Sequence, residues 1–131
     1  MKSRSILITG SAFMALAVAF GAFGAHIVQD MLTPERFDVY QTGVEYHFYH
    51  ALGLLITGAV SMHFNNNKWI ARSAGLFIAG ILIFSGSLYV LTLTDTGWLG
   101  AITPIGGVAF ILGWIFFAVG VATSRVKSLD D

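Results

Sequence analysis

The chain alternates long apolar runs with short polar connections. Four runs extend approximately over residues 6–25, 46–64, 70–93 and 100–122. Each is close to the roughly 20 residues that an α-helix needs to cross about 30 Å of hydrocarbon. No run shows the sustained alternation of apolar and polar residues that is typical of a membrane β-strand. The pattern therefore predicts an all-α, polytopic membrane protein in which four transmembrane helices form a single bundle, with residues 1–131 as one domain.

The polar stretch between the first two runs predicts an amphipathic helix over approximately residues 34–45. Thr33 is a suitable N-cap, and Pro34 suits the first helical turn. Phe37, Tyr40 and Val44 then supply an apolar and aromatic side. The sequence leaves open whether this helix continues into the second span or bends before it.

Composition agrees with a membrane location. The chain is 56% hydrophobic and 11% charged, whereas an ordinary soluble domain is about 25% charged. Its formal net charge is zero, and no block of basic residues provides a surface for nucleic acid, so the lipid bilayer is the expected partner. The absence of cysteine excludes disulfides and thiolate metal ligands.

The distribution of basic residues predicts the orientation. They flank the N-terminus, the second connection and the C-terminal end of the last run: Lys2, Arg4, Lys68, Arg72, Arg125 and Lys127. The positive-inside rule then places both termini in the cytoplasm. The first run also resembles a cleavable signal peptide, but its length of about 20 residues exceeds a signal core of 7–15, so we expect it to remain as the first span.

Small residues recur along the predicted spans, with a period of seven in the first and fourth. The set comprises Gly10, Ala17, Gly24, Ala51, Gly58, Gly80, Gly106, Gly113 and Gly120. Such positions let helix backbones approach closely, within the bundle, in a homo-oligomer or against another membrane protein. A second line of Ala12, Ala15, Ala19 and Ala22 predicts that the first span has two neighbours. The alternative is that glycine and alanine are simply common in membrane helices.

Polar side chains gather at one end of the predicted spans, around the segment EYHFYH. His47 and His50 share the side of the second span that carries its small residues. His26 extends the alanine line of the first span, and Ser85 and Tyr89 lie towards the outer end of the third. The predicted topology places all five residues in the outer half of the membrane.

Two interpretations of this cluster remain open. The histidines can fasten helices through hydrogen bonds, or they can line a pocket for a haem, a metal ion, a quinone or a lipid. The sequence contains no HExxH motif and no paired nucleophile and base, so it indicates no catalytic residues. We therefore expect an accessory or regulatory helical bundle, with ligand binding as the alternative.

Several segments together resemble one known family. They are GAFGAH at residues 21–26, YQTGVEYHFYHALGLL at 40–55, GILIFSGSLYVL at 80–91 and ITPIGGVAFILGW at 102–114. In this order they resemble the YgdD-like small inner-membrane proteins, known as domain of unknown function 423, and they cover nearly the whole chain. The resemblance implies a four-helix bacterial inner-membrane protein. It carries no activity and assigns no functional residue.

Overall fold

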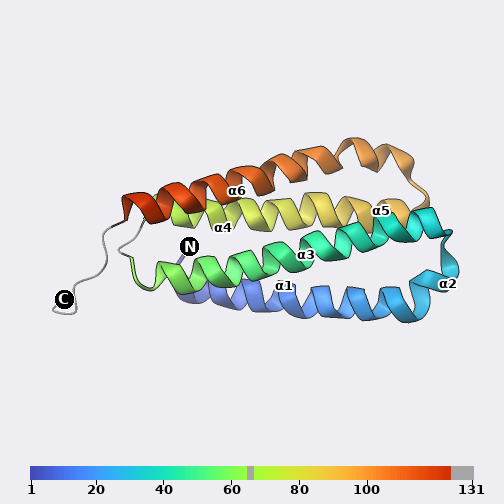
Figure 1. Ribbon diagram of the computed structural model, residues 1–131, viewed down its shortest axis with the longest axis horizontal. Coiled ribbons are helices and arrows are strands. Elements are labelled where there is room, and N and C mark those ends of the chain that lie inside the picture. The colour runs from blue at the N-terminus through green and yellow to red at the C-terminus, as the bar shows by residue number, and fades with distance from the viewer. Residues whose placement is uncertain (65–66, 125–131) are drawn as a thin grey trace.

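A computed structural model describes residues 1–64 and 67–124, which form four helical rods and no strand (Figure 1). The first rod runs through α1 (Ser3–Phe23), a π-helical turn (Gly24–Val28) and α2 (Gln29–Met31). The second is α3 (Pro34–Ser61). The third contains α4 (Lys68–Gly80), a second π-helical turn (Ile81–Ser85) and α5 (Gly86–Thr94). The fourth begins with a 3-10 turn (Gly97–Ala101) and continues as α6 (Thr103–Thr123).

The rods pack as two antiparallel pairs that meet through α3. α1 lies along α3, and α6 lies along α4. α3 also contacts α4 and α5, so it is the helix that joins the two pairs (Figure 1). The main apolar core lies where these helices meet, and it includes Leu54 of α3, Phe77 of α4 and Phe110 of α6.

Three of the four rods are long and apolar enough to cross a membrane, namely residues 3–31, 68–94 and 97–123. α3 is 28 residues long, but it is absent from this set. Glu45, His47 and His50 lie in this helix and lower its mean hydropathy. The sequence prediction of four transmembrane helices is therefore supported for three rods by length and apolarity.

α3 joins the predicted amphipathic helix and the predicted second span into one continuous helix. The side-chain oxygen of Thr33 accepts a hydrogen bond from the backbone N–H of Arg36 and caps its first turn. Gly43 is buried inside this helix, where a Cβ atom would lie 3.1 Å from the ring of Tyr89. Gly43 thus allows α5 to approach α3 closely.

Glycines of α4 and α6 receive aromatic rings from the facing helix. A Cβ atom added at Gly113 would lie 2.7 Å from the ring of Phe77. Gly80 faces Phe110 in the same way, and Gly106 faces Phe84. A side chain at Gly80 or Gly113 would overlap a ring, and one at Gly106 would overlap the backbone of Phe84, so the close contact between the two helices depends on glycine.

The contact between α1 and α3 uses the first small-residue line. A Cβ atom at Gly58 would lie 2.8 Å from the side chain of Leu7, and Ala17 is fully buried. In contrast, Ala15, Ala19 and Ala22 are exposed. Among the described residues, α1 packs mainly on α3 and turns its alanine line to the surface, so the predicted second neighbour at this face is not a helix of the same chain.

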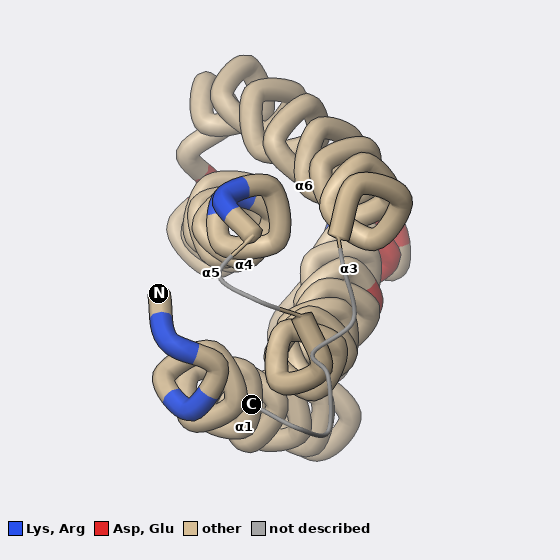
Figure 2. Tube along the Cα trace, turned by 90° about the vertical axis from the view of Figure 1, so that its left-hand side faces the viewer, with Lys and Arg blue, Asp and Glu red and all other residues tan. Residues whose placement is uncertain are grey.

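The two ends of the bundle differ in charge. Figure 2 looks at the end where α1 and α4 begin, and Lys and Arg segments mark both helix starts. We call this the basic end, and it carries Lys2, Arg4, Lys68 and Arg72. The opposite, acidic end includes Asp30, Glu35, Asp38 and Asp95. The charge asymmetry in the sequence thus becomes an asymmetry between the two ends of the helices.

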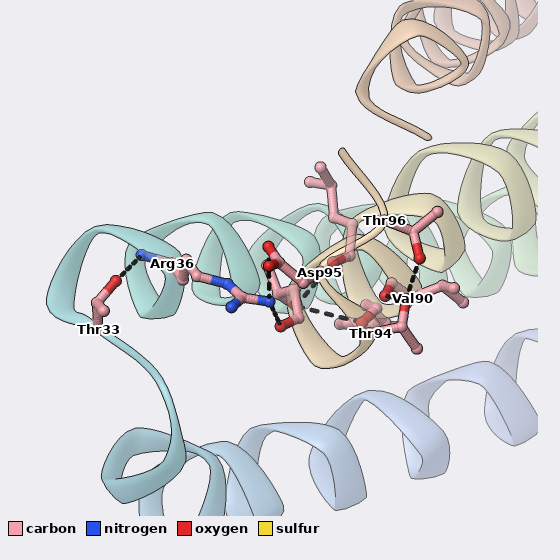
Figure 3. Close-up of polar contacts among 9 residues, drawn as sticks. Thr33, Arg36, Val90, Thr94, Asp95 and Thr96 are labelled. Carbon is pink, nitrogen blue, oxygen red and sulfur yellow. Dashed lines mark hydrogen bonds and ion pairs between the residues drawn. The ribbon is translucent and has the colours of Figure 1, made fainter. Parts of the chain in front are cut away.

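At the acidic end, Arg36 links α3 to the end of α5 (Figure 3). One guanidinium nitrogen donates to the backbone carbonyl of Thr92 at 2.5 Å and lies 3.5 Å from a carboxylate oxygen of Asp95. Asp95 has φ of 57°, the left-handed conformation that often ends a helix. The cation therefore satisfies a terminal carbonyl of α5, where a positive charge is also favoured by the helix dipole.

Candidate functional site

The centre of the candidate site is a pair formed by His47 of α3 and Tyr89 of α5. Both side chains are buried, with exposed fractions of 3% and 8%. Nδ1 of His47 lies 3.1 Å from the Tyr89 hydroxyl, a hydrogen bond in which the histidine tautomer decides the donor. The pair therefore connects two helices that are far apart in the sequence.

Aromatic rings of α1 enclose this pair. Phe20 stacks on Tyr89 with ring centroids 4.5 Å apart and an interplanar angle of 12°. Phe13 meets the His47 ring edge to face at 5.8 Å. Tyr40 packs against Tyr89 and donates its hydroxyl to the Phe20 carbonyl at 2.7 Å. Three rods thus contribute to one buried aromatic and polar layer.

Two polar atoms of the predicted cluster are buried without a partner. Among the described residues, Nε2 of His47 and Oγ of Ser85 make no hydrogen bond. Ser85 precedes Tyr89 by four residues and closes the π-helical turn Ile81–Ser85. An unpaired buried polar group carries a penalty of about 1–3 kcal/mol, and such groups are commonly satisfied by a buried water. π-helical turns inside α-helices also occur often at functional sites.

His50 lies in a different environment, between α3 and α6. Its ring stacks on Phe110 with centroids 3.4 Å apart and an interplanar angle of 10°. The Trp114 indole N–H donates to Nε2 at 3.2 Å, and Nδ1 lies 2.7 Å from the Tyr46 carbonyl. Because indole N–H is only a donor, Nε2 must be unprotonated and Nδ1 carries the hydrogen that Tyr46 accepts. Both ring nitrogens are therefore used within the protein.

The structure thus divides the five predicted residues into three groups. His47, Tyr89 and Ser85 lie along the contact between α3 and the third rod. His50 faces α6 instead. His26 lies in the π-helical turn Gly24–Val28, is exposed, and has no side-chain hydrogen bond to any described residue. His26 and His50 therefore share no partner among the described residues, because His26 continues an alanine face that α3 does not cover.

Metal coordination has no obvious location in the described part of the chain. Within residues 1–64 and 67–124, no group of three or more His, Asp or Glu side chains is arranged to hold a metal ion. Nδ1 of His47 is hydrogen-bonded to Tyr89, and Nδ1 of His50 to the backbone of Tyr46. Nε2 of His50 accepts a hydrogen bond from Trp114. Metal or haem ligation by either residue at Nδ1, or by His50 at Nε2, would first have to break a hydrogen bond.

An aromatic groove lies beside His50 on the outside of the bundle. It has a volume of about 450 Å³, opens laterally and is lined by residues of α3 and α6 together with Phe84. Its walls are mostly apolar, and Tyr46 and Tyr49 supply phenol groups. A lateral groove of this shape suits a hydrocarbon chain better than a polar substrate.

Sequence reasoning did not find Trp114, Tyr40 and Arg36 as partners in these networks. Trp114 and Tyr40 make hydrogen bonds across helices, to His50 and to the Phe20 carbonyl. Their pairing depends on which helix lies opposite, and helical periodicity in one segment gives no information on that. Arg36 could have been singled out from the sequence, because it is the only Lys or Arg in the acidic segment 26–45.

Comparisons with known proteins agree with the resemblance seen in the motifs. A family model described as "Protein of unknown function (DUF423)" matches residues 20–107. The "UPF0382 membrane protein YwdK" of Bacillus subtilis is 44% identical over 116 residues, which are 88% of this chain and 94% of the relative. The "UPF0382 inner membrane protein YgdD" of Escherichia coli is 36% identical over 130 residues, or 99% and 98% of the two chains. No solved structure matches the chain.

Proposed function

Because the chain belongs to the DUF423 (UPF0382) family of membrane proteins, we propose that it is a noncatalytic, four-span bundle with an accessory or regulatory role towards other membrane components. The observation that carries the proposal is the state of His50. Both of its ring nitrogens are engaged within the protein, by Tyr46 and by Trp114. The His50 ring therefore links α3 to α6 and has no free nitrogen that could bind a metal or a haem.

The proposal includes α3 as the fourth span. Its buried side contains the polar residues His47, His50 and Thr57, so these groups would be shielded from lipid. Its outward side carries exposed apolar residues such as Leu52 and Ile56. A helix with its polar groups inside and apolar groups outside fits a bilayer although its overall composition is less apolar.

The orientation in the proposal follows from the two ends of the bundle. The basic end would face the cytoplasm, in agreement with the positive-inside rule, and the acidic end would face outwards. Both termini would then be cytoplasmic in the inner membrane. His47, His50 and Tyr89 would lie in the outer half of the bilayer.

An accessory role requires a surface for other molecules of the membrane. α1 packs mainly on α3, and α6 packs mainly on α4, so both helices have an outward face. These faces expose many large apolar side chains, among them Ile8, Val18, Ile111 and Ile115. These faces suit lipid, a second copy of the chain or helices of another membrane protein. The absence of a recognisable pair of nucleophile and base on the sequence fits this role better than it fits catalysis.

Ligand binding is the second candidate, and the aromatic groove favours it. The groove of about 450 Å³ beside Tyr46, Tyr49 and Trp114 would accept a lipid tail or the side chain of a quinone. In this version Tyr46 and Tyr49 would donate hydrogen bonds to a carbonyl group at the groove's mouth.

An optical spectrum and a metal analysis of the protein purified from membranes would test the proposal. A noncatalytic bundle without a metal or haem predicts no absorption above the aromatic region and less than one metal ion per chain. Stoichiometric haem or metal that disappears in the variant His50→Gln would overturn it. A quinone or lipid extracted in stoichiometric amount, and lost when Gly107→Leu fills the groove, would favour the second candidate.

A further inference from the structure

A second cavity lies at the basic end, far from the aromatic groove. It has a volume of about 200 Å³ and forms where the first turns of α1 and α4 meet the last turn of α3. Ser3 and Ile6 come from α1, Ser61 from the end of α3, and Lys68 and Ala71 from α4. Three rods therefore build one pocket at the level where the helices emerge from the apolar part of the bundle.

The lining of this pocket is amphipathic. Ser3 and Lys68 provide a hydroxyl group and a cation, whereas Ile6 and Ile70 are buried apolar residues. Exposed apolar side chains continue outside the pocket, since Ile8 on α1 is 60% exposed and Met62 beyond α3 is 55% exposed. A ligand with a polar head and a hydrocarbon tail would match both the pocket and the surface next to it.

Among the described residues, the charges around the pocket have one sign. Lys2 and Arg4 flank Ser3, and Arg72 follows Lys68 by one helical turn. Within residues 1–64 and 67–124, all five carboxylates lie away from this pocket. Asp30 is in α2, Glu35, Asp38 and Glu45 are in the N-terminal half of α3, and Asp95 follows α5. Figure 2 shows the basic segments around the starts of α1 and α4. The local field therefore favours an anion.

We propose that this pocket binds the headgroup of an anionic phospholipid, with the phosphate near Lys68 and Ser3 and the acyl chains along the exposed apolar surface of α1. Basic pockets between membrane helices on the cytoplasmic side are suited to acidic headgroups. Free inorganic phosphate offers the same charge, but it would leave the apolar wall of Ile6 and Ile70 without a partner. The inference rests on the proposed orientation only for its assignment to the cytoplasmic leaflet.

The test is thermal unfolding of the full chain in neutral detergent, titrated with phosphatidylglycerol, phosphatidylcholine or inorganic phosphate. The site predicts saturable stabilisation by phosphatidylglycerol alone. Equal stabilisation by phosphatidylcholine would overturn the preference for an anion, and equal stabilisation by inorganic phosphate would overturn the assignment to a lipid. Because the titration is done in detergent, its result does not depend on the orientation of the protein in the membrane.

Two substitutions localise the effect. Lys68→Gln should reduce the apparent affinity for phosphatidylglycerol about fivefold, as expected for the loss of one cation near an anionic headgroup. Lys68→Arg keeps the charge and should retain the affinity of the unmodified protein. Ala71→Leu should fill the pocket without a change of charge and abolish the saturable stabilisation.

Each substitution has a matched control. Arg4→Gln removes the same charge from the same end but does not line the pocket, so it should have the smaller effect. Gly75→Leu places the same side chain on α4, one turn beyond, where a Cβ atom meets nothing within 4 Å. Equal losses in Arg4→Gln and Lys68→Gln, or in Gly75→Leu and Ala71→Leu, would overturn the pocket as the binding site.

Discussion

The indole N–H of Trp114 donates to Nε2 of His50 across 3.2 Å, and this contact ties α6 to α3. The two residues are 64 positions apart in the sequence, and the bond is one of few side-chain hydrogen bonds that cross between the two helix pairs. Together with the Tyr46 carbonyl at Nδ1, this bond leaves His50 with no free ring nitrogen. The same contact that packs the helices therefore opposes metal or haem binding by His50.

Removal of the Trp114 donor should destabilise the bundle. In Trp114→Phe the aromatic ring remains against Phe77, but Nε2 of His50 loses its partner. We expect a decrease in the free energy of unfolding of about 1–3 kcal/mol, because a buried acceptor is left unpaired. Denaturant titration in detergent measures it. Trp98→Phe is the control, since Trp98 is 67% exposed, and an equal effect in the two variants would contradict the contact.

The Tyr89 hydroxyl should contribute in a similar way to the contact between α3 and α5. Tyr89→Phe keeps the stack on Phe20 and removes the partner of His47 Nδ1. Since Nε2 is already without a partner, the change should lower the free energy of unfolding by about 1–3 kcal/mol. The exposed Tyr49 provides the control Tyr49→Phe, for which we expect no change. A Tyr89→Phe protein as stable as the unmodified one would refute this role.

Glycine at position 113 should be essential for the close packing of α4 and α6. A Cβ atom there would lie 2.7 Å from the Phe77 ring. Gly113→Ala should therefore overpack this contact, lower the free energy of unfolding by about 1–3 kcal/mol and reduce the thermal midpoint. At Gly107 on the same helix, a Cβ atom would meet Phe84 at 3.8 Å, an ordinary contact. Gly107→Ala should therefore be neutral. If both variants melted alike, the helices would not be in contact at Gly113.

Local sequence patterns predict which residues of a single helix share a packing face. The period of seven in the fourth span led to Gly106, Gly113 and Gly120, and each of them faces the third rod in the structure. These positions could be predicted because a helix presents residues seven apart on the same side. The start of α3 was also predictable, since Thr33 and Pro34 are local signals for a helix N-terminus.

The partners of the histidines could not be predicted in the same way. His47 and His50 are close in the sequence and both are buried, but one pairs with α5 and the other with α6. This choice depends on which helices surround α3. The π-helical turns at 24–28 and 81–85 add a further difficulty, because they change the rotation per residue near His26 and Ser85. A wheel drawn with a constant angle of 100° does not include that change.

The proposed orientation predicts the outcome of reporter fusions. Because Lys and Arg gather at the basic end, a cytoplasm-dependent reporter fused after Thr123 should be active, and an export-dependent reporter inserted beside Asp38 should be active. Fusions after Leu93, by contrast, should behave like those at Asp38. Identical signals at Asp38 and after Thr123 would mean that α3 does not cross the membrane together with the other three rods.

We propose that the buried histidines fasten helices and bind no cofactor. ¹⁵N NMR of histidine-labelled protein in bilayers tests it most directly, because the nitrogen shifts report the tautomer and the coordination of each ring. For His50 we expect a neutral ring with Nδ1 protonated and Nε2 accepting from Trp114. This signal should be unchanged by a chelator and should change in Trp114→Phe. A His50 nitrogen bound to a metal, or a ring with Nε2 protonated, would contradict the account.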